Sequence, residues 1–280
     1  MTSAASIAGK VVVITGGARG IGFATARRLR DLGAQVAIGD VDEAKVKEAG
    51  ADLGLEVYGK LDVTDPDGFA TFLDEVERRL GPLDVLVNNA GIMPANPFVE
   101  EPDRVTRRIL DINVYGVAVG SKLAAQRMVP RGRGTVINIA SLAGETPTPG
   151  LATYCASKAA VLALTDSLRV EYRTSGVRFC AVLPTFTNTE LIAGTAGAKG
   201  LKNAEPSDIA EAVAKLITTP RPRVAVTRAA GLLVSLTKRL LPRAGGEYLA
   251  RRFGLEHTFL DDVDQEARRA YEQRARGLDN

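Results

Sequence analysis

Histidine, tryptophan and cysteine are scarce in this 280-residue sequence, which has one histidine, no tryptophan and two cysteines. The single histidine, His257, excludes a histidine-rich metal site and argues against a Ser-His-Asp triad. Cys155 and Cys180 lack metal-ligand spacing, so we expect them to be packing residues and predict no bound metal. Aromatic residues make up only 5% of the chain, which argues against a stacking surface for nucleic acid.

Long apolar runs are also missing. No segment approaches the ~20 consecutive apolar residues of a membrane span. The first residues, MTSAASIAGK, lack the apolar stretch of a signal peptide, so we expect a soluble, cytoplasmic protein. The net charge is only +3, but residues 221–252 hold eight Lys or Arg and one acid, a local charge of +7.

Short apolar runs alternate with longer amphipathic ones along the chain. Runs such as KVVVITG at residues 10–16 are typical of buried strands. Six strand–helix alternations in one order predict an α/β fold with a parallel sheet and helices on both faces. The pattern also predicts one long helix over 103–129, a helix over 206–220 and a short last strand at 223–227.

No linker or repeat divides the chain, so we predict one doubly wound domain over residues 1–280. Its cofactor and catalytic core would occupy residues 8–192. A substrate loop and a basic helical extension would occupy residues 193–280.

Three glycines, Gly16, Gly20 and Gly22, stand between the first predicted strand and the first predicted helix. Glycine permits a tight turn and a close approach of the backbone to a pyrophosphate at a helix N-terminus. A glycine trio alone is also compatible with a structural turn. Its position between strand and helix favours a dinucleotide-binding loop.

Asp40 closes the second predicted strand, eighteen residues after Gly22. A carboxylate there would accept hydrogen bonds from the adenosine ribose and repel a 2′-phosphate. Arg19, inside the glycine loop, would instead favour NADP, unless it is a surface charge or pairs with an acid. We predict NAD rather than NADP.

Two further strand ends carry candidate cofactor residues. Asp62 and Val63 end the third predicted strand, where they would meet the adenine; the alternative for Asp62 is a helix N-cap before Pro66. NNAG at 88–91 follows the fourth predicted strand. Its asparagines can tie neighbouring strands together, while its last two residues leave room for a cofactor.

Together these motifs resemble those of the short-chain dehydrogenase/reductase family. The resemblance rests on TGGARGIG, NNAG, the asparagine of DINVYG, the serine of INIAS, and YCASK, and it covers roughly residues 10–191. It implies one Rossmann-type domain with about seven parallel strands. It also implies a homodimer or homotetramer joined through the long helices around 105–128 and 153–174, whose small residues include Ala124, Ala125, Ala159 and Ala160.

The resemblance assigns a catalytic tetrad of Asn113, Ser141, Tyr154 and Lys158. After Pro184, relatives commonly have glycine where this chain has Thr185, and a following threonine, here preferably Thr187, contacts the nicotinamide carboxamide. With the loop residues above, the expected cofactor contacts are Gly16, Arg19, Gly20, Ile21, Gly22, Asp40, Asp62, Val63, Asn89, Ala90, Gly91, Tyr154, Lys158, Pro184, Thr187 and Thr189.

The spacing of Tyr154 and Lys158 has a chemical reason. Hydride transfer from an alcohol also requires proton transfer at its oxygen, and a free tyrosine has a pKa of ~10. A lysine four residues later lies on the same helix face, so its charge would lower the pKa of Tyr154. Ser141 would hold the substrate oxygen, and Asn113 would hold a water that links Lys158 to solvent. Taken alone, Tyr154 and Lys158 would be an ordinary helix pair.

The substrate pocket is expected over Ser141 and Tyr154, with few charged residues and Glu145 as the main exception. We therefore expect a small hydrophobic alcohol or ketone, such as a steroid, retinoid or lipid. The expected apolar lining is Met93, Phe98, Leu142, Leu151, Leu191 and Ile192.

The basic segment predicts a helix with leucines at 232, 233, 236 and 240 on one face. Such a helix can lie on an anionic membrane surface, cap the substrate pocket or pack on a second subunit; these alternatives stay open. The sequence as a whole predicts an NAD-dependent oxidoreductase acting on a hydrophobic secondary alcohol or ketone. The alternatives are an NADPH-dependent carbonyl reductase and a non-catalytic NAD-binding regulator, against which the intact tetrad argues.

Overall fold

A computed structural model of the chain describes residues 7–195, 202–240, 242–252, 257–260 and 263–278. Its centre is a seven-stranded sheet in which all neighbouring strands are parallel, in the order β3-β2-β1-β4-β5-β6-β7. The strands are β1 (Val11–Thr15), β2 (Gln35–Asp40), β3 (Val57–Lys60), β4 (Val85–Asn88), β5 (Gly134–Ile139), β6 (Val177–Pro184) and β7 (Arg223–Val226). The predicted α/β class, the parallel sheet and the last short strand are confirmed.

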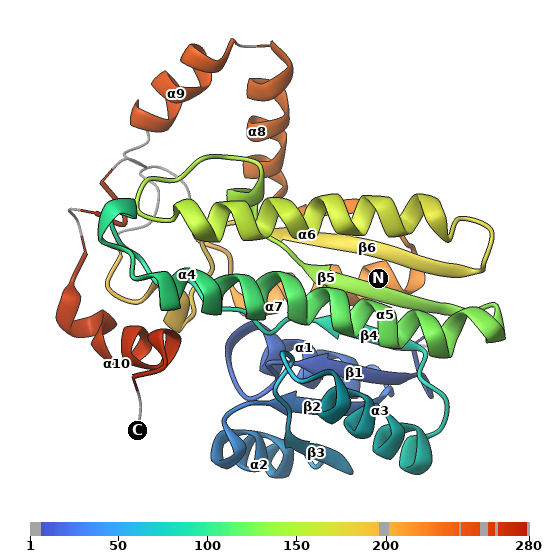
Figure 1. The fold of residues 1–280 in the computed structure, drawn as a ribbon. Coiled ribbons are helices and arrows are strands. Elements are labelled where there is room, and N and C mark those ends of the chain that lie inside the picture. Colours follow the sequence, from blue (N-terminus) through green and yellow to red (C-terminus); the bar gives the residue numbers. More distant parts are fainter. Residues whose placement is uncertain (1–6, 196–201, 241, 253–256, 261–262, 279–280) are drawn as a thin grey trace.

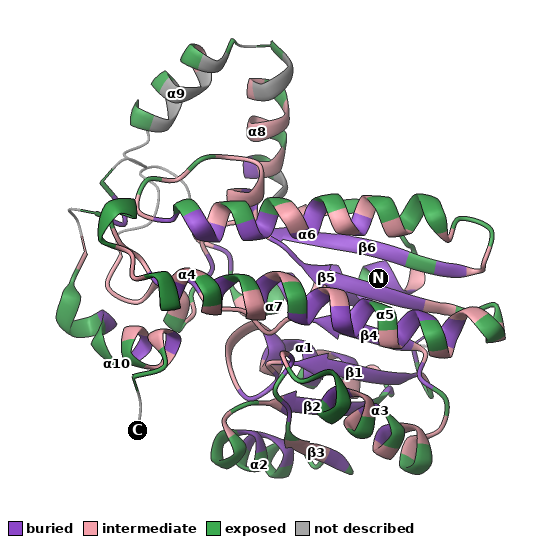
Figure 2. Ribbon diagram, in the orientation of Figure 1, coloured by how far each residue is buried: buried purple, intermediate pink, exposed green. Residues whose placement is uncertain are grey.

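Helices cover both faces of this sheet (Figure 1). Around the sheet lie α1 (Gly20–Asp31), α2 (Glu43–Asp52), α3 (Pro66–Leu80), α4 (Asp103–Leu110), α5 (Gly116–Met128), α6 (Ala152–Glu171) and α7 (Pro206–Thr218). One core cluster joins α1, α2 and α7 to one face of β1, and a second joins α3 and α5 to the other face. The central strands are therefore buried on both sides, which explains their continuous apolar runs (Figure 2).

The sheet order reverses between β1 and β4, which are neighbours although β2 and β3 separate them in sequence. Loops that leave such a switch point diverge at the carboxyl edge of the sheet and leave a crevice there. The residues that follow β1, β2, β4, β5 and β6 all meet at this edge.

The predicted long helix is interrupted by one irregular turn. Between α4 and α5, residues Asp111–Tyr115 form a π-helical turn, so the hydrogen-bond pattern changes within the helix predicted over 103–129. The fully buried Asn113 lies in this turn. π-Turns are commonly found at functional sites because they re-aim side chains.

Two of the four small residues expected at a subunit interface have another role. Ala124 and Ala125 are buried in the chain's own core between α5 and the sheet. They pack within the subunit, so that part of the expectation was wrong, whereas Ala159 on α6 is exposed.

The described residues of the C-terminal part add three helices beyond the sheet: α8 (Arg228–Leu240), α9 (Arg243–Arg252) and α10 (Gln265–Arg276). In Figure 1, α8 and α9 rise from one side, while α10 lies beside α4. The expected leucine face of α8 is divided. Leu233 faces the cavity described below, whereas Leu232, Leu236 and Leu240 are exposed. The side chains of Lys238 and Arg239 and all of Leu241 lie outside the described residues.

Candidate active site

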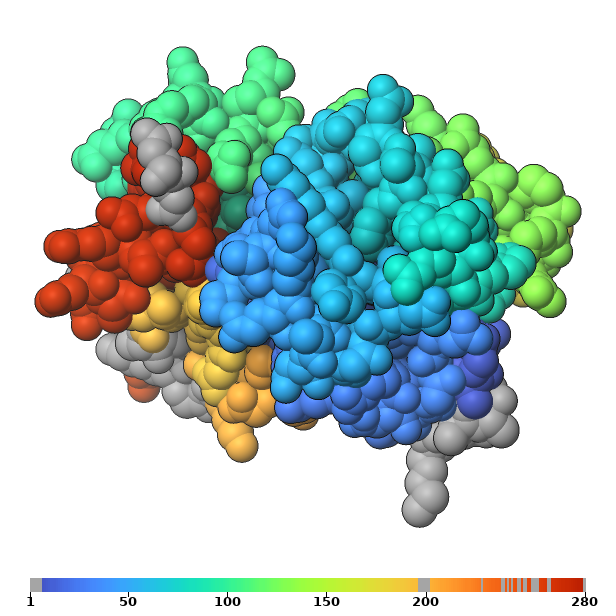
Figure 3. All heavy atoms as spheres, turned by 90° about the horizontal axis from the view of Figure 1, so that it is seen from below, coloured from blue at the N-terminus to red at the C-terminus, as the bar shows by residue number. Residues whose placement is uncertain are grey.

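A cavity of about 770 Å³ occupies the carboxyl edge of the sheet. It runs from the glycine loop and the ends of β2 and β3 to Ser141, Tyr154 and the C-terminal helix α10. From below, the red C-terminal residues lie beside the N-terminal half in blue (Figure 3). Of the expected cofactor residues, all but Gly22 line this cavity, and all the expected substrate contacts line it: Ser141, Tyr154, Met93, Leu142, Leu151 and Leu191.

The glycine loop is packed too tightly for side chains. Gly16 and Gly20 have φ of 63° and 54°, and a β-carbon on Gly16 would lie 2.9 Å from the Cα of Ala90. A β-carbon on Gly22 would lie 2.1 Å from the Gly16 carbonyl oxygen, so this glycine lets α1 approach the loop. At Arg19 no described side chain caps the N-terminus of α1. Its free N–H groups therefore suit a pyrophosphate.

Asp40 lies at the end of β2, where backbone N–H groups fix its carboxylate. The N–H groups of Ala18 and Asp42 donate to its two oxygens, both at 3.1 Å. Arg19 pairs with Asp42 at 2.5 Å, as one of the alternatives expected. Burial opposes ionisation of Asp42, but hydrogen bonds from the Lys45 backbone and the Arg19 guanidinium prevail and lower its pKa. The guanidinium that would attract a 2′-phosphate is thus partly neutralised.

The alternative reading of Asp62 as a helix cap was wrong. Asp65 caps α3, whereas the Asp62 carboxylate accepts hydrogen bonds from the backbone and hydroxyl of Thr64 and borders the cavity. The asparagines of NNAG tie strands together as expected. The Asn88 amide donates to Asn138 on β5 at 2.9 Å, and the Asn89 amide donates to the Thr15 and Gly16 carbonyls.

Tyr154 and Ser141 come together at the substrate end of the cavity. Ser141 follows β5 and caps the short 3₁₀ turn Leu142–Gly144, and Tyr154 lies in the first turn of α6, 7% exposed. Burial raises the pKa of Tyr154 to about 12, while a hydrogen bond with Ser141 acts in the opposite direction. We expected Lys158 to lower the pKa of Tyr154. With the protein groups alone this pKa is raised instead, because the loss of solvation is the largest effect.

Lys158 lies beneath this pair. Its Nζ donates to the Ile139 carbonyl at 3.0 Å and lies 5.7 Å from the centre of the Tyr154 ring. Burial lowers the pKa of Lys158 to about 8. A β-carbon on Gly91 would lie 3.4 Å from this Nζ and 3.2 Å from the Asn113 Oδ1, so Gly91 leaves the space beside both groups open.

Asn113 holds the loop after β4 in place. Its Oδ1 accepts from the Ile92 N–H at 2.9 Å, and its Nδ2 donates to the Ile92 carbonyl and to Ser157 Oγ. These bonds fix the loop against α6. The expected water link from Asn113 to Lys158 stays a prediction.

The segment after Pro184 accepts threonine in place of glycine without strain. The Thr185 N–H donates to the Val226 carbonyl of β7 at 2.6 Å, and no described residue other than glycine has a positive φ. Thr187 is buried and donates to the Thr185 carbonyl. The methyl group of Thr189 lies beside Gly20 of the glycine loop, so this segment covers the loop.

The substrate end is an apolar chamber with a charged rim. Tyr154 packs with Met93, Leu151 and Phe259, and Leu191 and Ile192 lie against them. Phe98 was wrongly expected in this lining, because it is 68% exposed. The expected scarcity of charge was also wrong. Glu145 pairs with Arg223, whereas α4 and α10 bring five arginines to the cavity: Arg104, Arg107, Arg108, Arg274 and Arg276.

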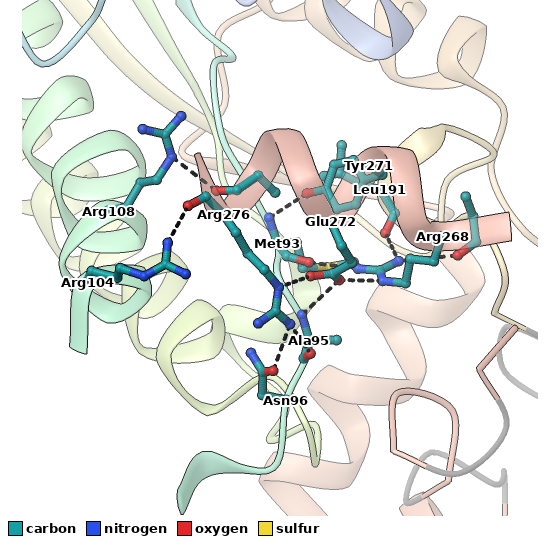
Figure 4. Close-up of polar contacts among 12 residues, drawn as sticks. Met93, Ala95, Asn96, Arg104, Arg108, Leu191, Arg268, Tyr271, Glu272 and Arg276 are labelled. Atoms are coloured by element: carbon teal, nitrogen blue, oxygen red, sulfur yellow. Dashed lines mark hydrogen bonds and ion pairs between the residues drawn. The ribbon is translucent and has the colours of Figure 1, made fainter. Parts of the chain in front are cut away.

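Sequence reasoning missed the role of α10, which binds both loops of the chamber (Figure 4). Arg268, 1% exposed, donates to the carbonyls of Leu191 at 2.6 Å and Met93 at 2.8 Å and pairs with Glu272. Glu272 also accepts from the Ala95 N–H. Arg104 and Arg108 of α4 donate to the last carbonyls of α10. The spacing of Arg268, Tyr271 and Ala275 was the one available signal of a buried face on this charged helix.

A family model described as short chain dehydrogenase matches residues 10–199. The chain belongs to the short-chain dehydrogenase/reductase family. It is 40% identical over 224 residues to a cis-4-hydroxycyclohexanecarboxylate dehydrogenase of Sinomonas cyclohexanicum, covering 75% of this chain and 90% of that protein. It is 37% identical over 191 residues to the 2,5-dichloro-2,5-cyclohexadiene-1,4-diol dehydrogenase LinX of Sphingobium indicum, covering 67% and 76%.

A solved member of the same family shows the same fold. A 3-ketoacyl-(acyl-carrier-protein) reductase from Brucella melitensis, crystallised with NADH, superposes with a TM-score of 0.71 at 26% identity and covers 79% of this chain and 97% of that one. Members of the family bind NAD or NADP, so the chain is an oxidoreductase with a nucleotide cofactor. Its tight glycine loop, the uncapped start of α1 and the fixed Asp40 carboxylate suit such a cofactor.

The described residues give little support for cysteine or metal chemistry. Burial raises the pKa of both cysteine thiols, that of Cys180 to about 11, which makes neither a ready nucleophile and agrees with packing roles. The described residues hold no cluster of three potential metal ligands. None of the helices that the structure describes is both long and apolar enough to cross a bilayer.

Proposed function

We propose that the chain is an NAD-dependent dehydrogenase that interconverts a small alicyclic secondary alcohol and its ketone. The observation that carries this proposal is one cavity that joins the glycine loop to an apolar chamber containing Tyr154 and Ser141. The chamber gives a hydrocarbon ring a place to bind, and the two hydroxyl groups give its oxygen a partner.

The proposed roles follow from the side chains themselves. Ser141 binds the substrate oxygen, and Tyr154 takes its proton during oxidation or returns it during reduction. Lys158 and Asn113 position Tyr154 and the loop after β4. The dinucleotide, when bound, supplies or accepts the hydride.

The size of the cavity supports a small substrate. Pockets for a single drug-sized ligand measure ~300–1,000 Å³, and here about 770 Å³ must hold a dinucleotide as well as the substrate. The names of the two relatives above describe hydroxylated six-membered rings. We therefore favour alicyclic alcohols over the steroids and retinoids that the apolar lining suggested.

The preference for NAD rests on the end of β2. The Asp40 carboxylate borders the cavity where an adenosine ribose would lie, and Arg19 is paired with Asp42. A 2′-phosphate would meet a carboxylate and a guanidinium that already has a partner.

The function is tested by screening cyclohexanols and cyclohexanones with NAD and NADP while following absorbance of the reduced cofactor. We expect oxidation of a ring alcohol with a higher kcat/KM for NAD. Better use of NADP, with reduction favoured, would support the carbonyl reductase instead. Binding of NAD without turnover of any alcohol would support the regulator.

Tyr154→Phe is the matching variant. Because it removes only the proton-transferring hydroxyl, we expect kcat to fall by ~10²–10⁴ while NAD affinity, measured by titration calorimetry, changes little. Tyr58→Phe is the control, because Tyr58 lies on the edge strand β3 outside the cavity lining. Equal activity of the Tyr154 variant and wild type would refute the role of this hydroxyl.

A further inference from the structure

The C-terminal helix places a second phenol in the chamber. Tyr271 of α10 is 7% exposed and borders the same cavity as Tyr154 of α6. The Arg268 guanidinium lies 5.0 Å from the centre of its ring, and Arg268 is itself bound to the loops on both sides. Tyr271 is therefore held in place by these contacts. It lies outside residues 10–199, the part of the chain that the family model matches.

The hydroxyl of Tyr271 uses only half of its hydrogen-bonding capacity. It accepts a hydrogen bond from the Met93 N–H at 2.6 Å, and among the described residues this is its only hydrogen bond. A phenol can also donate one, and buried donors in proteins are almost always paired. Burial raises the pKa of Tyr271, so the hydroxyl keeps its proton at neutral pH.

The two phenols are close enough to affect each other. Ionisation of Tyr154 raises the pKa of Tyr271 further, and both residues line the same cavity. Tyr154 and Ser141 are engaged with the reacting oxygen in the proposed function. The Tyr271 proton is then free for a different oxygen of the same substrate.

We propose that Tyr271 is a substrate-recognition residue that donates a hydrogen bond to a second oxygen on the ring substrate, separate from the oxygen that reacts. The substrate class is thereby narrowed to small cyclic alcohols with a second hydroxyl, carbonyl or carboxylate group. This inference rests on the proposed function, because it assigns the reacting oxygen to Tyr154 and Ser141.

The test compares substrates of equal size with and without the second oxygen. Initial rates are measured with NAD for the 1,2-, 1,3- and 1,4-cyclohexanediols and for the methylcyclohexanols with the same substitution pattern. A buried donor that loses its acceptor costs enough to change rates by roughly 10- to 100-fold. For at least one diol we expect kcat/KM to exceed that of its methyl counterpart by this factor.

Tyr271→Phe is expected to remove the preference. It keeps the ring that packs on Arg268, so kcat/KM should fall by roughly 10- to 100-fold for the preferred diol and by less than about threefold for its methyl counterpart. Tyr248→Phe is the matched control, because Tyr248 is also C-terminal but 65% exposed. A purely structural role of Tyr271 would lower both rates together, and that result would overturn the inference.

Two further outcomes separate this inference from the function on which it rests. If the wild-type enzyme oxidises diols and methylcyclohexanols equally well, the inference is overturned while the proposed function stands. This comparison does not depend on the folding of any variant. Wild-type enzyme that binds NAD but oxidises no ring alcohol overturns the proposed function and the inference together.

Discussion

At the scale of single residues, the chemistry depends on when Tyr154 ionises. Burial raises its pKa to about 12, and the hydrogen bond with Ser141 opposes this rise. Alcohol oxidation requires the phenolate, so the protein groups alone keep the residue mostly in the acid form at neutral pH. The rate of oxidation should therefore increase with pH, whereas ketone reduction, which needs the protonated phenol, should decrease.

Ser141→Ala tests this dependence. Without the hydrogen bond the pKa of Tyr154 rises further, so the kcat/KM profile for oxidation should shift to higher pH. Because a hydrogen bond to a charged group is lost, kcat/KM at pH 7 should also fall by roughly 10- to 100-fold. Rates measured from pH 6 to 10 check both effects, and a shift of the profile to lower pH would contradict the assignment.

At the scale of elements, α10 joins loops that lie far away in the sequence. Arg268 supplies donors to three backbone carbonyls, those of Met93, Leu191 and Ala193, and to the Glu272 carboxylate. Removing one partner of a buried ion pair typically costs ~3–5 kcal/mol. Glu272 keeps Arg276 as a second partner, so the lower part of this range applies.

Arg268→Met should therefore reduce the free energy of unfolding by about 3 kcal/mol and raise KM, because both loops lining the chamber lose a contact. Arg269→Met is the matched control. Arg269 is the next residue on the helix and is exposed, so we expect the free energy of unfolding to change by no more than ~0.5 kcal/mol. Urea unfolding of the two variants gives the comparison. Equal stabilities would show that α10 does not hold the chamber together.

The elements also show what the sequence could and could not predict. The strands and the glycine loop were predicted because local patterns determine them, and they brought Asp40, Ser141 and Tyr154 to one edge. The π-turn at Asn113 was missed because it shifts the apolar spacing by only one position, and many of the residues that follow in α5 are small. The contact of Tyr271 with Met93 was missed because the two residues are 178 positions apart in the sequence. In addition, the charged sequence of α10, which carries Tyr271, is typical of an exposed helix.

At the scale of the whole molecule, one cavity connects the first strand with the last helix. Gly16 follows β1 and Tyr271 belongs to α10, yet both line the same space. Among the described segments, α10 has no core of its own and is held by contacts to the loops after β4 and β6. We therefore propose that residues 1–280 form one cooperative unit rather than a core with an independent extension.

A single unfolding transition is the expected consequence. Far-UV and near-UV circular dichroism should give the same midpoint, and a ligand that binds only the native state should raise it. NAD at 100 times its Kd adds ~2.7 kcal/mol, and at the ~2–4 °C per kcal/mol typical of larger domains this raises the midpoint by roughly 5–10 °C. Limited proteolysis gives the control, because NAD should protect sites within α10 as well as sites near the glycine loop. Cleavage within α10 that NAD does not slow, or a separate early transition, would mean that the C-terminal segment unfolds independently of the cofactor site.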